Sequence, residues 1–272
     1  MDDVARDNTG SRHQLWEIHR AASPVLATAI HDGHHVDSLV ASSVALDDAA
    51  RLREEDPFTG PMIAGVANRI ICNVSRFCID LNRPIDKAIY LQPSDAWDLV
   101  VWKRELRDAE IDHLRMMHQD YYAVLEAVLA GLERRYGRFI VLDVHSYNHR
   151  RAGQYDTPTA ADLAPDINIG TFSMDRQRWG HAVDAFVAFC RARTVNGRRL
   201  DVRENIAFEG RGEQTRFIHK RFPETGCAIA VEFKKIFMDE WTGAPDQECI
   251  DEIAALLAGA VPVLERALET AP

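Results

Sequence analysis

Short apolar runs alternate with longer amphipathic segments along the chain, which is the pattern of an α/β protein. The short runs predict strands at 25–30, 69–74, 77–81, 139–144, 166–171, 206–208 and 227–233. The runs 139–144 and 227–233 are apolar on both faces, except for one acid in each. Such runs are typical of central strands that helices cover on both sides.

Helices are predicted where apolar residues recur at a spacing of three or four. The predicted helices are 47–53, which Pro57 interrupts, then 111–136, which Gly137 ends, then 179–193 and 250–268. Together these elements predict a three-layer α/β/α sandwich with a central mixed sheet. No linker or repeat divides the chain, so we expect a single domain over 1–272. Within it, 1–20 would be an N-terminal extension and 246–272 a C-terminal helix.

Composition and charge narrow the classes of function. The chain has 272 residues, and its 32 basic and 42 acidic side chains give a formal charge of −10. This charge argues against nucleic acid as a partner. No run approaches the roughly 18 apolar residues of a membrane span, so no membrane partner is expected. Residues 1–8 are acidic and lack the apolar core of a signal peptide. These features predict a cytoplasmic protein.

The cysteines agree with a reducing compartment, because their number is odd and none form a CxxC pair. We expect free, mostly buried thiols at Cys72, Cys78, Cys190, Cys227 and Cys249.

Polar side chains interrupt or follow four of the predicted strands. They are His31, the run from Asp80 to Arg83, the pair Asp143 and His145, and Glu232. A buried polar group without a partner costs about 1–3 kcal/mol. Ligands of open α/β sheets collect at the carboxyl ends of strands. Four such groups on separate strands therefore predict a shared site.

His31 and His145 are the predicted metal ligands. Gly33 allows a sharp turn after the strand that carries His31, and the neighbouring His34 and His35 are expected to be loop residues that face solvent. Residues two apart on a strand face the same side, so Asp143 is expected to orient the His145 ring.

A serine hydrolase built from Asp143, His145 and Ser146 is the competing interpretation. The chain has no GxSxG elbow, and adjacent side chains on a strand point to opposite faces. Ser146 and Tyr147 are instead expected to line the site.

A metal held by two histidines usually takes a carboxylate as its third protein ligand. The run from Arg53 to Pro57 offers Glu55 and Asp56, although an acidic helix end facing water is the alternative. Glu232 lies in an apolar strand, and burial raises a carboxyl pKa toward the range of a general base. Its alternative role is to pair with Lys234 or Lys235.

Arg83 and Asn82 are suited to grip a substrate carboxylate, and Arg76 would add a second positive charge. The alternative is a structural ion pair of Arg83 with Asp80 or Asp86.

Six segments together resemble the N-formylglutamate amidohydrolase (N-formylglutamate deformylase) family. They are AIHDGHHV at 29–36, REEDPFTG at 53–60, VSRFCIDLNRP at 74–84, VLDVHSYN at 141–148, DINIGT at 166–171 and AVEFKKIF at 230–237. The family is similar to zinc carboxypeptidases and aspartoacylases, which implies a phosphorylase/hydrolase-like fold. Two departures are visible: Asp32 stands where the family more often has Ser, and Lys234 and Lys235 stand where it has Asn or Arg.

The resemblance implies a zinc-dependent amidohydrolase that cleaves an N-formyl or other N-acyl acidic amino acid. Zn²⁺ would be held by His31, His145 and Asp56, with Glu55 as the alternative acid. Glu232 would take a proton from the attacking water and deliver it to the leaving amine. The expected partner is therefore a small-molecule N-acyl amino acid. The rival hypotheses are a zinc carboxypeptidase or peptidoglycan-type amidase, and a non-catalytic metal-binding or regulatory protein.

Overall fold

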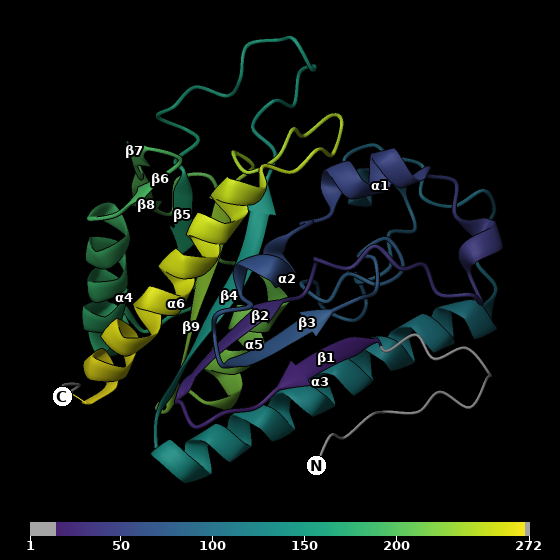
Figure 1. Ribbon diagram of the computed structural model, residues 1–272. Coiled ribbons are helices and arrows are strands. Elements are labelled where there is room, and N and C mark those ends of the chain that lie inside the picture. Colours follow the sequence, from purple (N-terminus) through teal and green to yellow (C-terminus); the bar gives the residue numbers. More distant parts are fainter. Residues whose placement is uncertain (1–14, 270–272) are drawn as a thin grey trace.

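A seven-stranded mixed sheet forms the centre of the computed structural model, which describes residues 15–269 (Figure 1). Its strands are β1 (Trp16–His19), β2 (Val25–Ala29), β3 (Asn68–Cys72), β4 (Phe139–Tyr147), β5 (Ile167–Gly170), β8 (Val202–Glu204) and β9 (Gly226–Lys234), in the order β1-β3-β2-β4-β9-β5-β8. The middle strands β3, β2, β4 and β9 are parallel, while β1 and β5 pair antiparallel to their neighbours β3 and β9. A small hairpin, β6 (Thr194–Val195) and β7 (Arg198–Arg199), lies outside this sheet.

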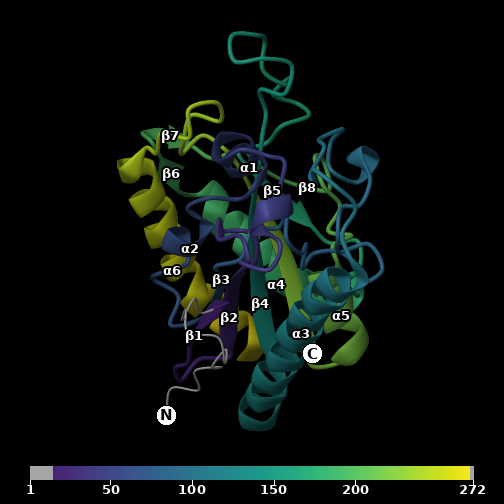
Figure 2. The same ribbon diagram turned by 90° about the vertical axis from the view of Figure 1, so that its right-hand side faces the viewer.

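Helices cover both faces of the sheet, which confirms the predicted α/β/α sandwich. The helices are α1 (Asp48–Glu54), α2 (Thr59–Met62), α3 (Asp108–Tyr136), α4 (Arg176–Arg191), α5 (Glu213–Arg221) and α6 (Gln247–Glu269). Two separate apolar clusters form the core, one under α2, α4 and α6 and the other under α3 and α5. Figures 1 and 2 show α3 on one side of the sheet and α4 and α6 on the other.

β4 is the strand on which the layers are built. All nine of its residues are buried, as expected for a central strand covered on both faces. Ile140, Leu142 and Val144 pack in the cluster under α4 and α6, while Phe139 and Val141 pack in the cluster under α3. The odd-numbered side chains of β4 therefore share the α3 face.

Most predicted elements are present, with ends that shift by a few residues. The predicted strands at 25–30, 69–74, 139–144, 166–171 and 227–233 correspond to β2, β3, β4, β5 and β9. The predicted helices correspond to α1, α3, α4 and α6, and Gly137 ends α3 with a φ of 76°.

The predicted strand at 77–81 is wrong, because this segment consists of turns. The amide of Cys78 donates to the carbonyl of Ser75, and the Ser75 hydroxyl accepts from the amide of Phe77. Phe77 and Cys78 are nevertheless buried in the cluster under α3. The apolar run reflects burial of a turn, which short-run periodicity does not distinguish from a strand.

The predicted strand at 206–208 is also wrong. β8 ends before it, and Asn205 has a φ of 55°, in the left-handed region that a strand cannot contain. The amides of Ile206 and Ala207 donate to the Asn168 side chain rather than to a strand.

Several short elements have no counterpart in the sequence prediction: α2, α5 and the strands β1, β6, β7 and β8. β1 is one of the two edge strands of the sheet and falls within the predicted N-terminal extension, 1–20, of which 1–14 lie outside the described residues. All five cysteines are free and buried, as predicted. Within residues 15–269, no helix is both long and apolar enough to cross a membrane.

The turn after β2 requires Gly33 because another backbone segment packs closely against it. A Cβ at Gly33 would lie 2.2 Å from the backbone carbon of Asn73. The two segments are joined there by the amide of His35, which donates to the Asn73 carbonyl. Glycine is therefore required by close backbone approach rather than by a left-handed conformation.

We expect Gly33→Ala to lower the free energy of unfolding by about 1–3 kcal/mol, because the added methyl group forces two backbones apart. Gly131→Ala in α3 is the matched control, since its added Cβ would meet only the Arg134 side chain, at 3.9 Å. That control should raise the free energy of unfolding by about 1 kcal/mol. Urea denaturation measures both. Equal effects of the two variants would contradict the requirement at Gly33.

Candidate active site

Three of the predicted site residues meet at the carboxyl ends of the parallel strands. His31 follows β2, His145 lies near the end of β4, and Glu232 lies directly opposite His145 on β9. Side chains in register on neighbouring strands share a face, so His145 and Glu232 project on the same side of the sheet. The sheet thus brings together residues that are 201 positions apart in sequence, from His31 to Glu232.

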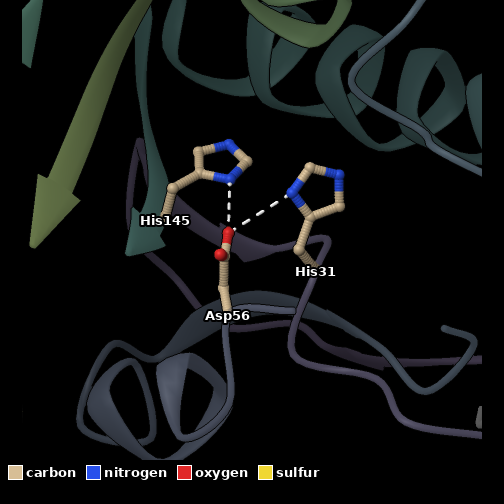
Figure 3. A group of neighbouring side chains, drawn as sticks. All are labelled: His31, Asp56 and His145. Atoms are coloured by element: carbon tan, nitrogen blue, oxygen red, sulfur yellow. Dashed lines mark hydrogen bonds and ion pairs between the residues drawn. The ribbon is translucent and has the colours of Figure 1, made fainter. Parts of the chain in front are cut away.

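His31, Asp56 and His145 form a buried cluster whose polar atoms point toward one another (Figure 3). Oδ2 of Asp56 lies 3.3 Å from Nδ1 of His31 and 3.1 Å from Nδ1 of His145. One ligand atom from each residue lies within 4.8 Å of the others, an arrangement that can hold a metal ion. The structure therefore brings together the three residues predicted as ligands.

A carboxylate holds the outer nitrogen of each histidine. Nε2 of His31 lies 2.7 Å from Oδ1 of Asp80, and Nε2 of His145 lies 3.0 Å from Oδ1 of Asp143. Such an acceptor fixes the ring orientation and leaves Nδ1 free to bind a metal. The geometry predicted for Asp143 is present, while Asp80 has a role toward His31 that the sequence did not indicate.

Gln214 of α5 supports this second layer of contacts. Its side-chain amide donates to Oδ1 of Asp143 at 2.5 Å and to the Thr28 hydroxyl at 2.7 Å, and its carbonyl accepts from Tyr121. Gln214 is fully buried. The polar groups around His145 are thus anchored in α5 and α3.

The cluster is strongly charged. Burial opposes ionisation of Asp56, but hydrogen bonds to His145 and His31 hold its pKa well below the usual range. Burial also opposes charge on His145, yet Asp143 and Asp56 raise its pKa well above the usual value. The lowered pKa of Asp56 and the raised pKa of His145 both favour a carboxylate next to a positive charge in this pocket.

The local chain explains why Asp56, and not Glu55, faces the histidines. α1 ends at Glu54, and the amide of Asp56 donates to the carbonyl of His31 at 2.9 Å. Glu55 turns away and is fully buried against Ser75 and His34, with 2.5 Å between its Oε2 and Nδ1 of His34. His34 is thus held by an acid rather than simply facing solvent as expected.

Glu232 lines the same cavity as the cluster. Burial raises its pKa to about 7, although His145 opposes the shift. The alternative pairing with lysine is not observed among the described residues. Nζ of Lys234 contacts Asp166 at 2.8 Å, and Nζ of Lys235 donates to the carbonyls of Arg53 and Glu55.

The cavity has a volume of about 150 Å³, so it can enclose only part of a small substrate. Its described lining includes Arg76 and Asn82, as expected, but not Arg83. Arg83 donates to the Asp95 carbonyl, lies 3.5 Å from Asp80 and stacks over the Tyr90 ring. The structural interpretation of Arg83 therefore fits its surroundings better than a substrate clamp.

Six residues that line the cavity were missed as site residues by the sequence interpretation. They are Glu54, Trp97, Asn148, Arg151, Phe208 and Lys235. Trp97 has a left-handed φ of 51°, and its ring packs against the guanidinium groups of Arg76 and Arg151. These residues lie in loops or at a helix end, where no strand or helix period marks them.

Ser146 and Tyr147 line the cavity as expected. The Ser146 hydroxyl is buried and has no hydrogen-bond partner within residues 15–269. Both ring nitrogens of His145 already face carboxylates. The geometry is therefore not that of a Ser-His-Asp hydrolase, in which histidine contacts the serine hydroxyl.

Solved structures share this fold. An N-formylglutamate amidohydrolase from Ralstonia eutropha superposes with a TM-score of 0.71 at 18% identity, covering 93% of this chain and 96% of that chain. A gene product from Agrobacterium tumefaciens superposes with a TM-score of 0.65 at 16% identity, covering 95% of this chain and 96% of that one. No curated protein matches the chain significantly.

The sequence profile of the N-formylglutamate amidohydrolase family matches residues 23–238. This range is most of the chain and contains every residue of the cluster and cavity described above. The chain therefore belongs to the N-formylglutamate amidohydrolase family and is a hydrolase that acts on amide C–N bonds.

Proposed function

We propose that the protein is a zinc-dependent amidohydrolase that cleaves N-formyl or other N-acyl derivatives of an acidic amino acid. The observation that carries this proposal is the buried cluster of His31, Asp56 and His145 beside Glu232. Hydrolysis would convert the amide and one water into a carboxylic acid, formate in the simplest case, and the free amino acid.

The donor set fits zinc. Zinc prefers histidine nitrogen and carboxylate oxygen in tetrahedral geometry, with bonds of about 2.0–2.2 Å. Ligand atoms on such a tetrahedron lie about 3.3 Å apart, as follows from these bond lengths. The distances from Asp56 Oδ2 to the two Nδ1 atoms, 3.3 and 3.1 Å, agree with this spacing. Three protein ligands leave a fourth position open, as in catalytic zinc sites.

Zinc held there would lower the pKa of a water molecule to roughly 7 and polarise the amide carbonyl. Glu232 projects from β9 beside His145 and accepts a proton from the attacking water, then delivers it to the leaving nitrogen. Asp80 and Asp143 hold the two histidine rings in place.

Arg76 and Asn82 would bind the carboxylate next to the scissile amide. Nδ2 of Asn82 lies 3.4 Å from His145 Nε2, and Arg76 is fixed by Asp80 at 3.0 Å. Both side chains line the cavity next to the ligand cluster. A guanidinium group and an amide at this position suit a substrate that carries a negative charge near the reacting bond.

Metal analysis of the purified protein, combined with a panel of N-acyl amino acids and short peptides, tests the proposal. We expect about one zinc per chain and hydrolysis of N-formyl amino acids. Cleavage of peptides alone would favour a carboxypeptidase or peptidoglycan-type amidase. A protein that binds zinc but turns over no substrate in the panel would be a non-catalytic metal-binding protein.

A further inference from the structure

Three cations lie around the carboxylate of Glu54: Arg53, Arg151 and Lys235. Glu54, Arg151 and Lys235 line the cavity, whereas Arg53 is not among its lining residues. Glu54 is shared, since Nη1 of Arg53 and Nη1 of Arg151 each lie 2.9 Å from one of its oxygens. One carboxylate therefore neutralises only part of the positive charge. Glu240, another acid near Lys235, is engaged by His149 and by the amides of His149 and Arg150.

Arg151 has hydrogen-bond donors to spare. Only its Nη1 contacts Glu54, and within residues 15–269 neither Nε nor Nη2 has a hydrogen-bond partner. Its side chain is 42% exposed, and the residue lines the cavity. A guanidinium group with a free edge facing a cavity is suited to bind a carboxylate through paired hydrogen bonds.

The position of Arg151 is constrained from two sides. Glu54, at the end of α1, holds Nη1, and the Trp97 ring lies 5.6 Å from the guanidinium carbon. Trp97 is itself 41% exposed, and its φ of 51° lies in the left-handed region, which is strained for a residue other than glycine. These contacts orient an arginine that comes from the long segment between β4 and β5, which rises beyond the end of β4 in Figure 1.

The polar side chains that line the cavity lie at different distances from the ligand cluster, so each would meet a different part of a substrate. Arg76 and Asn82 lie next to the ligand cluster, where a carboxylate on the carbon beside the scissile nitrogen must lie. Arg151 is at the exposed rim, and Arg83 does not line the cavity. A second carboxylate, several bonds farther from the amide, would meet Arg151.

Resting on the proposed function, we propose that Arg151 determines specificity by binding the side-chain carboxylate of an N-acyl dicarboxylic amino acid. Lys235 also lines the cavity, but its ammonium group holds the chain beside Asp56 through the carbonyls of Arg53 and Glu55. Arg151 is therefore the residue to vary.

The test compares N-formyl-L-glutamate with its neutral isostere N-formyl-L-glutamine on the zinc-loaded full chain. A charge-assisted hydrogen bond contributes about 1.5–3 kcal/mol, which is about a 10–100-fold change. We expect Arg151→Met to lower kcat/KM for the glutamate substrate by about 10–100-fold, mainly through KM. The value for the glutamine substrate should change by less than about 2-fold, and Arg151→Lys should recover part of the loss.

Arg150→Met is the matched control, because Arg150 is the preceding residue and does not line the described cavity. It should leave both substrates unaffected. Zinc content and thermal midpoint are measured for every variant to confirm an intact fold. An equal loss on both substrates, or a wild-type protein that does not prefer glutamate over glutamine, would overturn the role of Arg151.

N-formyl-L-phenylalanine separates the remaining outcomes, because Trp97 and Phe208 give the rim exposed aromatic surface. A clear preference for this substrate over glutamate would assign the rim to apolar side chains and overturn the inference. Hydrolysis of either N-formyl-L-glutamate or N-formyl-L-phenylalanine would leave the proposed amidohydrolase function in place. Failure of the wild-type protein to hydrolyse any of the three compounds would instead contradict the proposed function itself.

Discussion

Replacing Glu232 by Gln is expected to lower turnover of an N-formyl amino acid by about 10²–10⁴-fold while zinc content stays unchanged. The glutamine keeps the shape of the side chain but cannot accept a proton at neutral pH. Glu232 lines the cavity from β9, directly opposite His145 in the sheet register. Turnover per folded molecule, zinc content and thermal midpoint are measured on the same preparation.

Glu110→Gln is the control for loss of a different acid. Glu110 caps the start of α3 and is bound by Arg104 and Arg107, outside the described cavity lining. This variant should lose stability and keep its turnover per folded molecule. A Glu232→Gln variant that behaves the same way would make Glu232 a structural residue, and one that is fully active and stable would remove both roles.

Replacing His31, His145 or Asp56 by Ala is expected to reduce bound zinc from about one per chain to a small fraction. A site with two protein ligands binds zinc much more weakly than one with three. Asp56 contacts both histidines, whereas Glu55 is directed toward Ser75 and His34. Glu55→Gln is therefore the control, and it should keep its zinc.

Zinc content after dialysis, with the wild-type chain alongside, is the measurement. If both histidine variants keep their zinc, the ligand cluster is not the metal site. If Glu55→Gln loses zinc while Asp56→Ala keeps it, the wrong acid has been assigned. Circular dichroism distinguishes metal loss from unfolding in each variant.

The two incorrectly predicted strands, 77–81 and 206–208, show where a short hydrophobic pattern fails to predict the backbone conformation. The segment 77–81 is apolar except for Asp80 because its side chains enter the core, but the side chains of Ser75 and Asp80 accept hydrogen bonds from the amides of Phe77 and Asn82 and so form turns. Burial requires apolar residues whatever the backbone does, so a short apolar run cannot specify a strand. Longer patterns are more informative: the 29-residue helix α3, the fully buried strand β4 and the mostly buried strand β9 are predicted from the sequence, with only their ends misplaced.

The arginines show the same limit for chemistry. Arg83 follows Asn82 and looked suited to bind substrate, yet Asp80, the Asp95 carbonyl and the Tyr90 ring engage it. Arg151 gave no signal, because it lies in a loop with no periodicity. Its place at the cavity follows from contacts with Glu54 and Trp97, which are 97 and 54 positions away in sequence.

The sequence by itself determined the layers of the fold and the polar residues at strand ends that converge on the cavity. Apolar runs specify buried strands, and a polar residue at the end of such a run is costly unless it meets a partner. His31, His145 and Glu232 could be selected on that basis. Spacing within one strand also placed Asp143 beside His145, because alternate side chains share a face.

Only the tertiary structure shows that Asp56 rather than Glu55 faces the histidines and that Asp80 contacts His31. It also shows that Arg151 rather than Arg83 lines the cavity. Each of these choices depends on contacts between segments far apart in the chain. Adjacent residues such as Glu55 and Asp56 have nearly the same chemistry. Which one faces the histidines is set by a backbone hydrogen bond in which the amide of Asp56 donates to the carbonyl of His31, and this bond joins the chain after β2 to the chain after α1.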